Sequence, residues 1–191
     1  AHVYRAGLRD GSEVALKVLT PFAEARREIR ALFEQEFELM ARIEHPNVLK
    51  VMQAGVIAGT HYIEIEPVEG ETVWDRAQSQ KTIGLSDAIA IIQQMCSALD
   101  QVHQRRIVHR DVKPSNIMLD EKHGRAVLFD FGLAHDLDGP RPPEGRVFGS
   151  PMFLAPEQAL GNSVDGRTDL YGLGVTLYRL VVGAVPFYGE R

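Results

Sequence analysis

The first twenty residues carry the pattern of two β-strands joined by a tight turn. The ranges Val3 to Leu8 and Glu13 to Leu19 read as strands, and Asp10-Gly11 between them is typical of a hairpin. Lys17 falls on the same face of the second strand as Ala15, because side chains alternate across a strand. The presence of a charged side chain on this strand face requires an explanation.

The residues from Phe22 to Ile43 repeat their apolar positions with the period of an α-helix. At about 100° per residue, six apolar residues fall within roughly 60° of Glu36; they are Ile29, Leu32, Phe33, Leu39, Met40 and Ile43. Glu36 therefore sits near the centre of the core-facing stripe. A carboxylate there should have a partner, because burying it alone is expensive. We expect His45-Pro46-Asn47 to end the helix.

Two more strands are expected near Val48 to Val56 and His61 to Glu66, with a turn at Ala58-Gly59. Residues 67–70 contain Pro67 and Gly70 and read as a linker. Beyond this linker the pattern becomes mainly helical, so the boundary between two structural units is expected at residues 66–70.

The second half of the chain predicts three helices separated by irregular segments. Trp74 to Ser79 is a short helix, and Ser86 is a plausible N-cap for a longer one. The expected apolar face of that longer helix consists of Ile89, Ile92, Met95, Cys96, Leu99 and Val102. His135 to Gly149 is rich in proline and glycine and is expected to be an irregular loop. Thr168 to Val182 reads as a buried helix that Gly183 stops.

The composition excludes several classes of protein. The chain has 191 residues, of which 45% are hydrophobic and 25% charged, as in an ordinary globular protein and unlike a collagen or a disordered tail. Its net charge of −5 gives a nucleic-acid binder no support. The single cysteine, Cys96, fits a reducing compartment. No signal peptide or membrane-spanning stretch is visible, and both ends read as those of a fragment.

Four short motifs follow one another in a recognisable order. They are Val14-Ala15-Leu16-Lys17 on a strand, His109 to Asn116 in a loop, Asp130-Phe131-Gly132 after the apolar strand Ala126 to Phe129, and Ala155-Pro156-Glu157. In this order they resemble the protein-kinase signature set. The resemblance covers essentially the whole chain and is closest to the serine/threonine kinases, including the eukaryotic-type kinases of bacteria.

The resemblance implies an α+β fold, protein-kinase-like and two-lobed, with a β-rich N-lobe and a mainly α-helical C-lobe. The N-lobe is expected at residues 1–66, the hinge at 67–70 and an incomplete C-lobe at 71–191. Ala1 stands where the family has the third glycine of its glycine-rich loop, so most of that loop lies outside the sequence.

The implied activity is transfer of the γ-phosphate of ATP to Ser or Thr hydroxyls of protein substrates. Lys17 would hold the α- and β-phosphates, and Glu36 would orient Lys17. Asp111 is the candidate catalytic base. Lys113 matches the lysine that serine/threonine kinases place near the γ-phosphate, which favours Ser or Thr over Tyr as the acceptor.

Asp130 and Asn116 are the implied metal ligands. A carboxylate and an amide oxygen suit a hard cation, so Mg²⁺ is expected, with Mn²⁺ as an alternative. The residues that the resemblance places around adenine are Val3 and Ala15 as the roof, Met118 as the floor, Ile65 as the gatekeeper, and the backbone groups of Glu66 and Val68 as the hinge.

Three further expectations concern the frame of the site. The resemblance implies that Asp169 braces the catalytic loop from below, and that Met40, His109 and Phe131 stack in the active state. Ser150 is the only hydroxyl residue between Gly132 and Glu157 and is expected to contact Asp111 and Lys113. We hypothesise that activation does not use a phosphate at the usual upstream site, and that Asp136, Asp138 or Glu144 replaces that phosphate beside Arg110.

A pseudokinase scaffold or nucleotide-sensing module is the alternative, although the positions that such proteins usually lose, Lys17, Asp111 and Asp130, are all present. Lys113 and the Ala-Pro-Glu segment argue against a small-molecule kinase. The basic run from His103 to Lys113 lacks interleaved aromatic residues, so no nucleic-acid partner is expected; no zinc site and no membrane contact are expected either. The domain is expected in the cytoplasm, while the whole protein could be anchored in a membrane.

Overall fold

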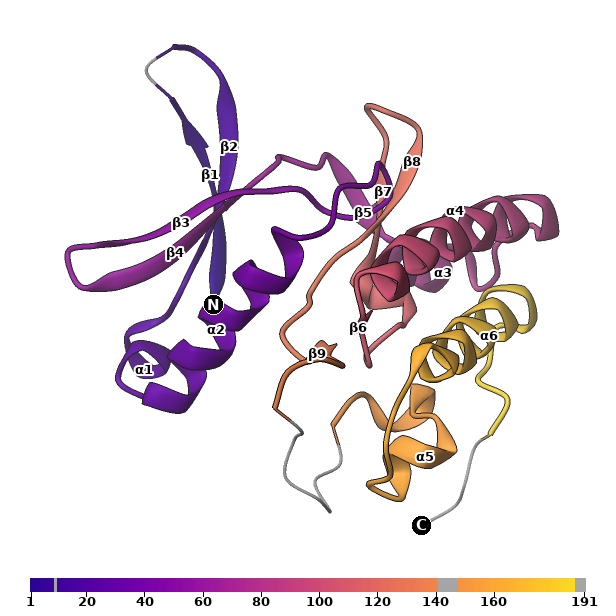
Figure 1. Ribbon diagram of the computed structural model, residues 1–191. Coiled ribbons are helices and arrows are strands. Elements are labelled where there is room, and N and C mark those ends of the chain that lie inside the picture. Colours follow the sequence, from indigo (N-terminus) through magenta and orange to yellow (C-terminus); the bar gives the residue numbers. More distant parts are fainter. Residues whose placement is uncertain (9, 141–147, 188–191) are drawn as a thin grey trace.

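The computed structural model describes residues 1–8, 10–140 and 148–187. Its first part is a four-stranded antiparallel sheet with helices α1 and α2 beside it (Figure 1). The strands are β1 (His2–Gly7), β2 (Glu13–Val18), β3 (Val51–Ile57) and β4 (Thr60–Ile65), in the order β1-β2-β4-β3. The predicted hairpin is present, with Val3 opposite Lys17.

Strand β3 begins three residues later than predicted. Val48 forms a parallel bridge with Leu128, and the backbone N–H of Leu49 donates to the carbonyl of Leu128 at 2.9 Å. Residues 47–49 are therefore attached to the second part of the molecule and not to the four-stranded sheet. The alternation of apolar residues could not distinguish the two attachments.

The single helix predicted from Phe22 to Ile43 is wrong, because the structure breaks it into α1 (Pro21–Glu24) and α2 (Arg27–Met40). Arg26 is extended between them, with φ −110° and ψ 110°. The cause is a tertiary contact: the Glu24 carboxylate accepts the backbone N–H of His61 at 3.0 Å, which turns α1 toward the start of β4. Helical periodicity carries no information about such a contact.

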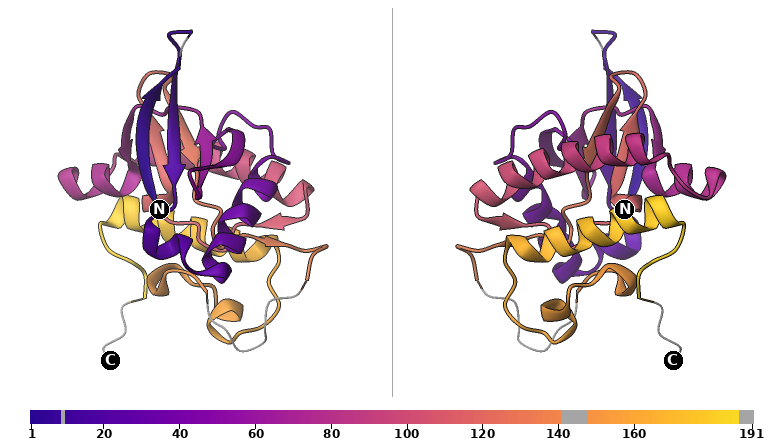
Figure 2. Two further views of the ribbon diagram at one scale, coloured as in Figure 1. Left: turned by 90° about the vertical axis from the view of Figure 1, so that its left-hand side faces the viewer. Right: turned by 90° about the vertical axis from the view of Figure 1, so that its right-hand side faces the viewer.

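The second part combines helices with two small sheets. Strands β5 (Gly70–Thr72), β7 (Ile117–Asp120) and β8 (Arg125–Leu128) form one sheet, and β6 (Ile107–Val108) pairs with β9 (His135–Asp136). The helices are α3 (Val73–Gln80), α4 (Leu85–Gln104), α5 (Pro156–Ala159) and α6 (Gly166–Val182), with short 3-10 turns at Pro114–Asn116 and Pro151–Phe153. Helices α4 and α6 run side by side (Figure 2).

Two predictions about α4 need correction. The helix begins after Gly84, so Ser86 lies inside the first turn and is not the N-cap. Its buried face contains Ala88, Ile91, Met95, Ala98, Leu99 and Val102, whereas Ile89 is 44% exposed and Cys96 is exposed. A pattern weighted toward large side chains overlooks a stripe that includes two alanines. The end of α6 follows the prediction, with Gly183 in the left-handed region at φ 83°.

One hydrophobic core joins the two parts of the molecule. Leu39 and Met40 from helix α2 pack in the same cluster as Met95, Leu128 and Phe131 from the second part. A smaller cluster, which includes Phe33 and Ile63, lies between α2 and the four-stranded sheet. Helix α2 therefore contributes to both clusters, which fixes its position relative to the loops after β6 and β8. None of the helices formed by the described residues is long and apolar enough to cross a membrane.

We predict that replacing Met95 with alanine lowers the free energy of unfolding by about 2–5 kcal/mol, because Met95 is fully buried. Ile89→Ala on the neighbouring face of α4 should cost at most about 1 kcal/mol. Urea unfolding of both variants measures the difference. Equal losses would show that α4 buries the face predicted from its large residues.

Candidate functional site

Lys17 and Glu36 form an ion pair between strand β2 and helix α2. The Lys17 Nζ lies 2.6 Å from Glu36 Oε1 and 2.7 Å from Oε2, and the Glu36 side chain is only 5% exposed. This is the partner that the position of Glu36 on the apolar stripe required. Removing one member of such a buried pair leaves an uncompensated charge, which typically costs about 3–5 kcal/mol. The pair therefore sets the distance between the sheet and α2.

Asp130 approaches the same lysine from the second part of the molecule. Its Oδ1 lies 3.8 Å from Lys17 Nζ, and its side chain is 47% exposed. Asp130 has φ 65°, in the left-handed region, which a residue other than glycine adopts only when its surroundings hold it there. The lysine thus lies between a buried carboxylate and a half-exposed one, and the exposed one can accept a further cation.

These three side chains open on a cavity of about 430 Å³. Val3 and Ile65 also line it, as do the apolar side chains of Leu19, Ile29, Leu32 and Phe33. The predicted adenine contacts Ala15, Glu66, Val68 and Met118 are not among the lining residues. Ala15 lies opposite Ile65 in the β2–β4 ladder, and Met118 lies on β7. Their contact with adenine stays a prediction.

A second polar cluster surrounds Asp111. Lys113 Nζ donates to Asp111 Oδ2 at 2.6 Å and to Ser150 Oγ at 2.6 Å, and Ser150 Oγ donates to Asp111 Oδ1 at 3.0 Å. Asn116 Nδ2 donates to Asp111 Oδ2 at 3.0 Å and to the Asp111 carbonyl at 2.9 Å. The expected contacts of Ser150 are present. The amide nitrogen of Asn116 is turned toward Asp111, which leaves its oxygen as the group available to a cation.

Asp169 on α6 holds the backbone of this loop. Its carboxylate accepts the backbone N–H of His109 at 2.9 Å and that of Arg110 at 2.8 Å. Arg110 has φ 64°, so these bonds stabilise a strained conformation. His103 Nε2 also lies 2.8 Å from the Asp169 carboxylate. The predicted brace is present, and His103 is a third contact that the sequence reading did not assign.

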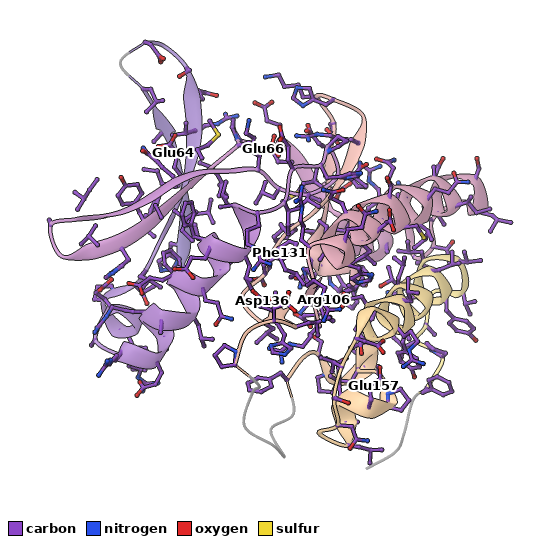
Figure 3. The ribbon with its side chains drawn as sticks, viewed as in Figure 1. Glu64, Glu66, Arg106, Phe131, Asp136 and Glu157 are labelled. Atoms are coloured by element: carbon purple, nitrogen blue, oxygen red, sulfur yellow. The ribbon has the colours of Figure 1, made fainter. Side chains whose placement is uncertain are left out.

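The loop is also joined to the segment that carries Asp130. The Phe129 N–H donates to the carbonyl of Asn116 at 3.1 Å, and His109 Nε2 lies 3.1 Å from the Phe129 carbonyl. The rings of His109 and Phe131 meet edge to face, with centroids 4.6 Å apart. Phe131 lies at the centre of the molecule in Figure 3, in the same buried cluster as Met40.

Arg110 does not pair with the acids that we expected. Asp136 binds Arg42, and Asp138 Oδ1 lies 3.3 Å from Arg106 Nε, so these two expectations are wrong. Arg106 directly precedes β6, and Asp136 is the β9 residue opposite Ile107; both are labelled in Figure 3. The third candidate, Glu144, lies outside the described residues.

The Arg110 guanidinium instead donates to the carbonyl of Leu133 at 2.5 Å and lies over the Phe148 ring, 5.2 Å from its centroid. Burial lowers the pKa of Arg110, although the Asp169 carboxylate opposes this effect. Gln158 Nε2 donates to the carbonyls of Arg110 at 2.9 Å and of Phe148 at 3.1 Å. The sequence reading missed Phe148 and Gln158, because neither belongs to a periodic pattern or a charged pair.

The donor set around the two polar clusters fits a divalent cation that also binds an oxygen-rich ligand. Asp130 offers a half-exposed carboxylate, and Asn116 offers its amide oxygen. The described residues contain no group of three or more His, Cys, Asp or Glu side chains placed to hold a metal by themselves. The protein therefore supplies part of a coordination shell, as in sites where substrate phosphates and waters complete it.

Comparisons of the chain with known proteins identify a matching family and similar proteins. A family model described as "Protein kinase domain" matches residues 1–191. The chain is 38% identical, over 98% of its length, to a probable serine/threonine-protein kinase of Clostridium perfringens. It is 36% identical to the serine/threonine-protein kinases Pkn1 of Myxococcus xanthus and PrkC of Bacillus subtilis, over 94% and 93% of its length. It spans 28%, 26% and 28% of these three relatives, in that order.

We predict that Asp169→Asn destabilises the protein by about 1–3 kcal/mol, because the amide can accept only one of the two N–H groups and opposes the other with a donor. Asp100→Asn is the matched control: Asp100 is an exposed residue of α4 that accepts a hydrogen bond from Gln104, and its replacement should change stability by less than about 0.5 kcal/mol. Urea unfolding measures both. Equal stability of the two variants would contradict the bracing role of Asp169.

Proposed function

The chain belongs to the protein kinase domain family, and we propose that the protein carrying it transfers the γ-phosphate of ATP to Ser or Thr hydroxyls of protein substrates. The observation that carries the proposal is the convergence of Lys17, Glu36 and Asp130 on one cavity. These residues come from the two parts of the molecule and meet only in the folded chain. The names of the relatives support the class of acceptor.

We assign the phosphate contacts to Lys17 and the acceptor contacts to Asp111 and Lys113. Lys17 carries the positive charge for the α- and β-phosphates, and Glu36 keeps its ammonium group in place. Asp111 accepts or aligns the proton of the substrate hydroxyl, and Lys113 lies 2.6 Å from it, where its charge can reach the transferred phosphoryl group. Positioning and electrostatic stabilisation then supply most of the catalysis.

We assign the metal to Asp130 and Asn116. The family uses ATP with a divalent metal ion in general, and the carboxylate and amide oxygens favour Mg²⁺, with Mn²⁺ as the alternative. When bound, the ion neutralises part of the phosphate charge. Asp111 keeps the Asn116 amide oriented through two hydrogen bonds, so the oxygen faces away from that carboxylate.

For the adenine ring we propose the family arrangement of roof, floor and hinge. Val3 and Ala15 form the roof, Met118 the floor and Ile65 the gatekeeper; Glu66 and Val68 offer backbone groups. The Glu66 N–H already donates to the carbonyl of Lys50 at 3.0 Å, so we assign its carbonyl to the ligand. In this proposal residues 1–66 are the N-lobe, 67–70 the hinge and 71–191 part of the C-lobe.

We further propose that this domain works in the cytoplasm, where ATP is available, on protein substrates, and without nucleic-acid or membrane contacts of its own. Its activation should not depend on a phosphate upstream of Gly149. The segment Gly132 to Gly149 contains no Ser, Thr or Tyr. The stacking of Arg110 on Phe148 and the Gln158 bridge support the proposal, because they connect the catalytic loop with this segment without a phosphate.

We predict that Lys17→Met and Asp130→Asn each lower phosphate transfer to a generic Ser/Thr acceptor by at least about 100-fold, because each removes charge that stabilises the reacting phosphates. Lys122→Met, an exposed lysine in the turn after β7, should leave transfer unchanged. The rate is measured with the whole protein as the transfer of ³²P from γ-labelled ATP to the acceptor. A wild-type protein that binds ATP and transfers no faster than these variants would favour the pseudokinase alternative.

A second prediction concerns Ser150. Treating the active protein with a phosphatase should leave its rate unchanged, whereas Ser150→Asp should lower it by more than about tenfold, because a second carboxylate then faces Asp111 where the hydroxyl lies 3.0 Å away. Ser150→Asn, which is similar in size and uncharged, is the control for steric effects. A loss of activity after phosphatase treatment that Ser150→Asp restores would overturn this account.

A further inference from the structure

Arg125, at the start of strand β8, joins three segments that are distant in the sequence. Its Nε donates to Asp120 Oδ2 at 2.9 Å, its NH2 group to Glu66 Oε2 at 2.8 Å, and its NH1 group to the carbonyl of Pro46 at 2.6 Å. The Arg125 side chain is only 20% exposed. Arg125 belongs to none of the four signature motifs, and the activity proposed above does not use it.

The Asp120 carboxylate accepts a hydrogen bond from the Arg125 guanidinium. It is 1% exposed and also lies 2.8 Å from His123 Nδ1. Burial alone would raise the pKa of Asp120, but the hydrogen bonds from His123 and Arg125 outweigh it and hold this pKa below its ordinary value. The pair is therefore ionised at neutral pH. Because Asp120 and Arg125 face each other in the β7–β8 ladder, the hairpin fixes the direction in which Arg125 points.

Arg125 also binds the side chain of Glu66, which directly follows strand β4. One oxygen of its carboxylate accepts from Arg125, and the other accepts the Lys50 N–H at 2.9 Å. The Glu66 N–H in turn donates to the carbonyl of Lys50 at 3.0 Å. Figure 3 shows Glu66 where the four-stranded sheet approaches the β7–β8 hairpin. Both oxygens and the N–H of Glu66 are thus engaged, so its backbone has one orientation.

The opposite end of the same segment is attached to the same hairpin. Glu121 N donates to the carbonyl of Glu69 at 2.9 Å, and Gly70 pairs with Asp120 in the β5–β7 ladder. A Cβ atom on Gly70 would lie 1.9 Å from the Leu119 carbonyl oxygen, so only glycine permits this approach. Residues 66–70 are therefore tied to one hairpin at both ends, by a backbone ladder at one and by Arg125 at the other.

We propose that Arg125 is a positioning residue for nucleotide binding: through Glu66 it fixes the hinge backbone at a set distance from Met118 on the same hairpin. The inference rests on the proposed function, because Glu66, Val68 and Met118 are assigned there to adenine. In this proposal Arg125 contacts neither the phosphates of ATP nor the acceptor. It affects only the affinity with which the purine ring is bound. A guanidinium is needed because three acceptors in different directions must be reached at once.

The test compares Arg125→Met, Arg125→Lys and Glu66→Met in the whole protein. Arg125→Met should raise the KM for ATP and the Kd of ADP by about three- to tenfold while kcat changes little, since the lost coupling acts on ground-state binding. Arg125→Lys should restore part of the affinity. Hydrogen exchange at the Lys50 and Glu66 amides, which are hydrogen-bonded between these two residues, should be faster in Arg125→Met without nucleotide, a readout that needs no activity.

A double-mutant cycle separates this role from general stabilisation. If Arg125 acts through Glu66, Arg125→Met should add little to the effect of Glu66→Met, which removes both carboxylate oxygens, on the Kd of ADP. Glu66→Met leaves the buried Asp120–Arg125 pair intact, so it decides the question even if Arg125→Met does not fold. Arg167→Met is the matched control, because Arg167 pairs with Asp165 at a side-chain exposure of 87%.

Three outcomes would overturn the inference. They are an unchanged Kd of ADP in Glu66→Met, fully additive effects in the cycle, and a fall in kcat at constant KM. A wild-type protein that fails to bind ADP would instead contradict the proposed function, and the exchange rates of the Lys50 and Glu66 amides would still report whether Arg125 holds this segment.

Discussion

The buried charge of Glu36 is the constraint on which the rest of the site depends. A helix that packs on a core with a carboxylate at the centre of its apolar face is stable only with a cation within reach. Lys17 on β2 provides that cation, and the pair fixes how closely α2 approaches the sheet. Helix α2 also sends Leu39 and Met40 into the core of the second part. One ion pair thus relates the sheet to the loops that carry Asp111 and Asp130.

Backbone strain appears where the chemistry is proposed. Arg110 and Asp130 both have positive φ. Arg110 directly precedes Asp111, and the Asp130 carboxylate lies beside Lys17. The carboxylate of Asp169 compensates the first by binding two consecutive N–H groups, and the bonds between residues 109, 116 and 129 hold the approach to the second. Such conformations persist only in surroundings that over-determine them. The buried positions of Asp169 and His109 are explained by this requirement.

The sequence predicted those features whose cause lies in local pattern or in a compact motif. The β1–β2 hairpin followed from the strand and turn pattern, and the need for a partner of Glu36 followed from its burial cost, whereas the brace by Asp169 and the contacts of Ser150 came from the family resemblance. The break before α2 and the buried face of α4 did not, because a contact with His61 and the small volume of alanine decide them. Arg110 shows the same limit: its expected acids bind Arg42 and Arg106, and an aromatic ring takes their place. The assignment of Ala15, Val68 and Met118 to adenine rests on the family resemblance alone.

The β7–β8 hairpin connects distant parts of the proposed site and fixes their relative positions. Asn116 directly precedes β7, and Asp130 follows β8 after one residue, so both metal-ligand candidates lie at the open end of the hairpin. The bond from Phe129 N to Asn116 O continues the ladder between them. The turn end carries Asp120 and Arg125, which reach residues 66–70. The same hairpin therefore holds the proposed metal ligands at one end and the contacts to residues 66–70 at the other, so a single ladder fixes how far apart the two groups of contacts lie.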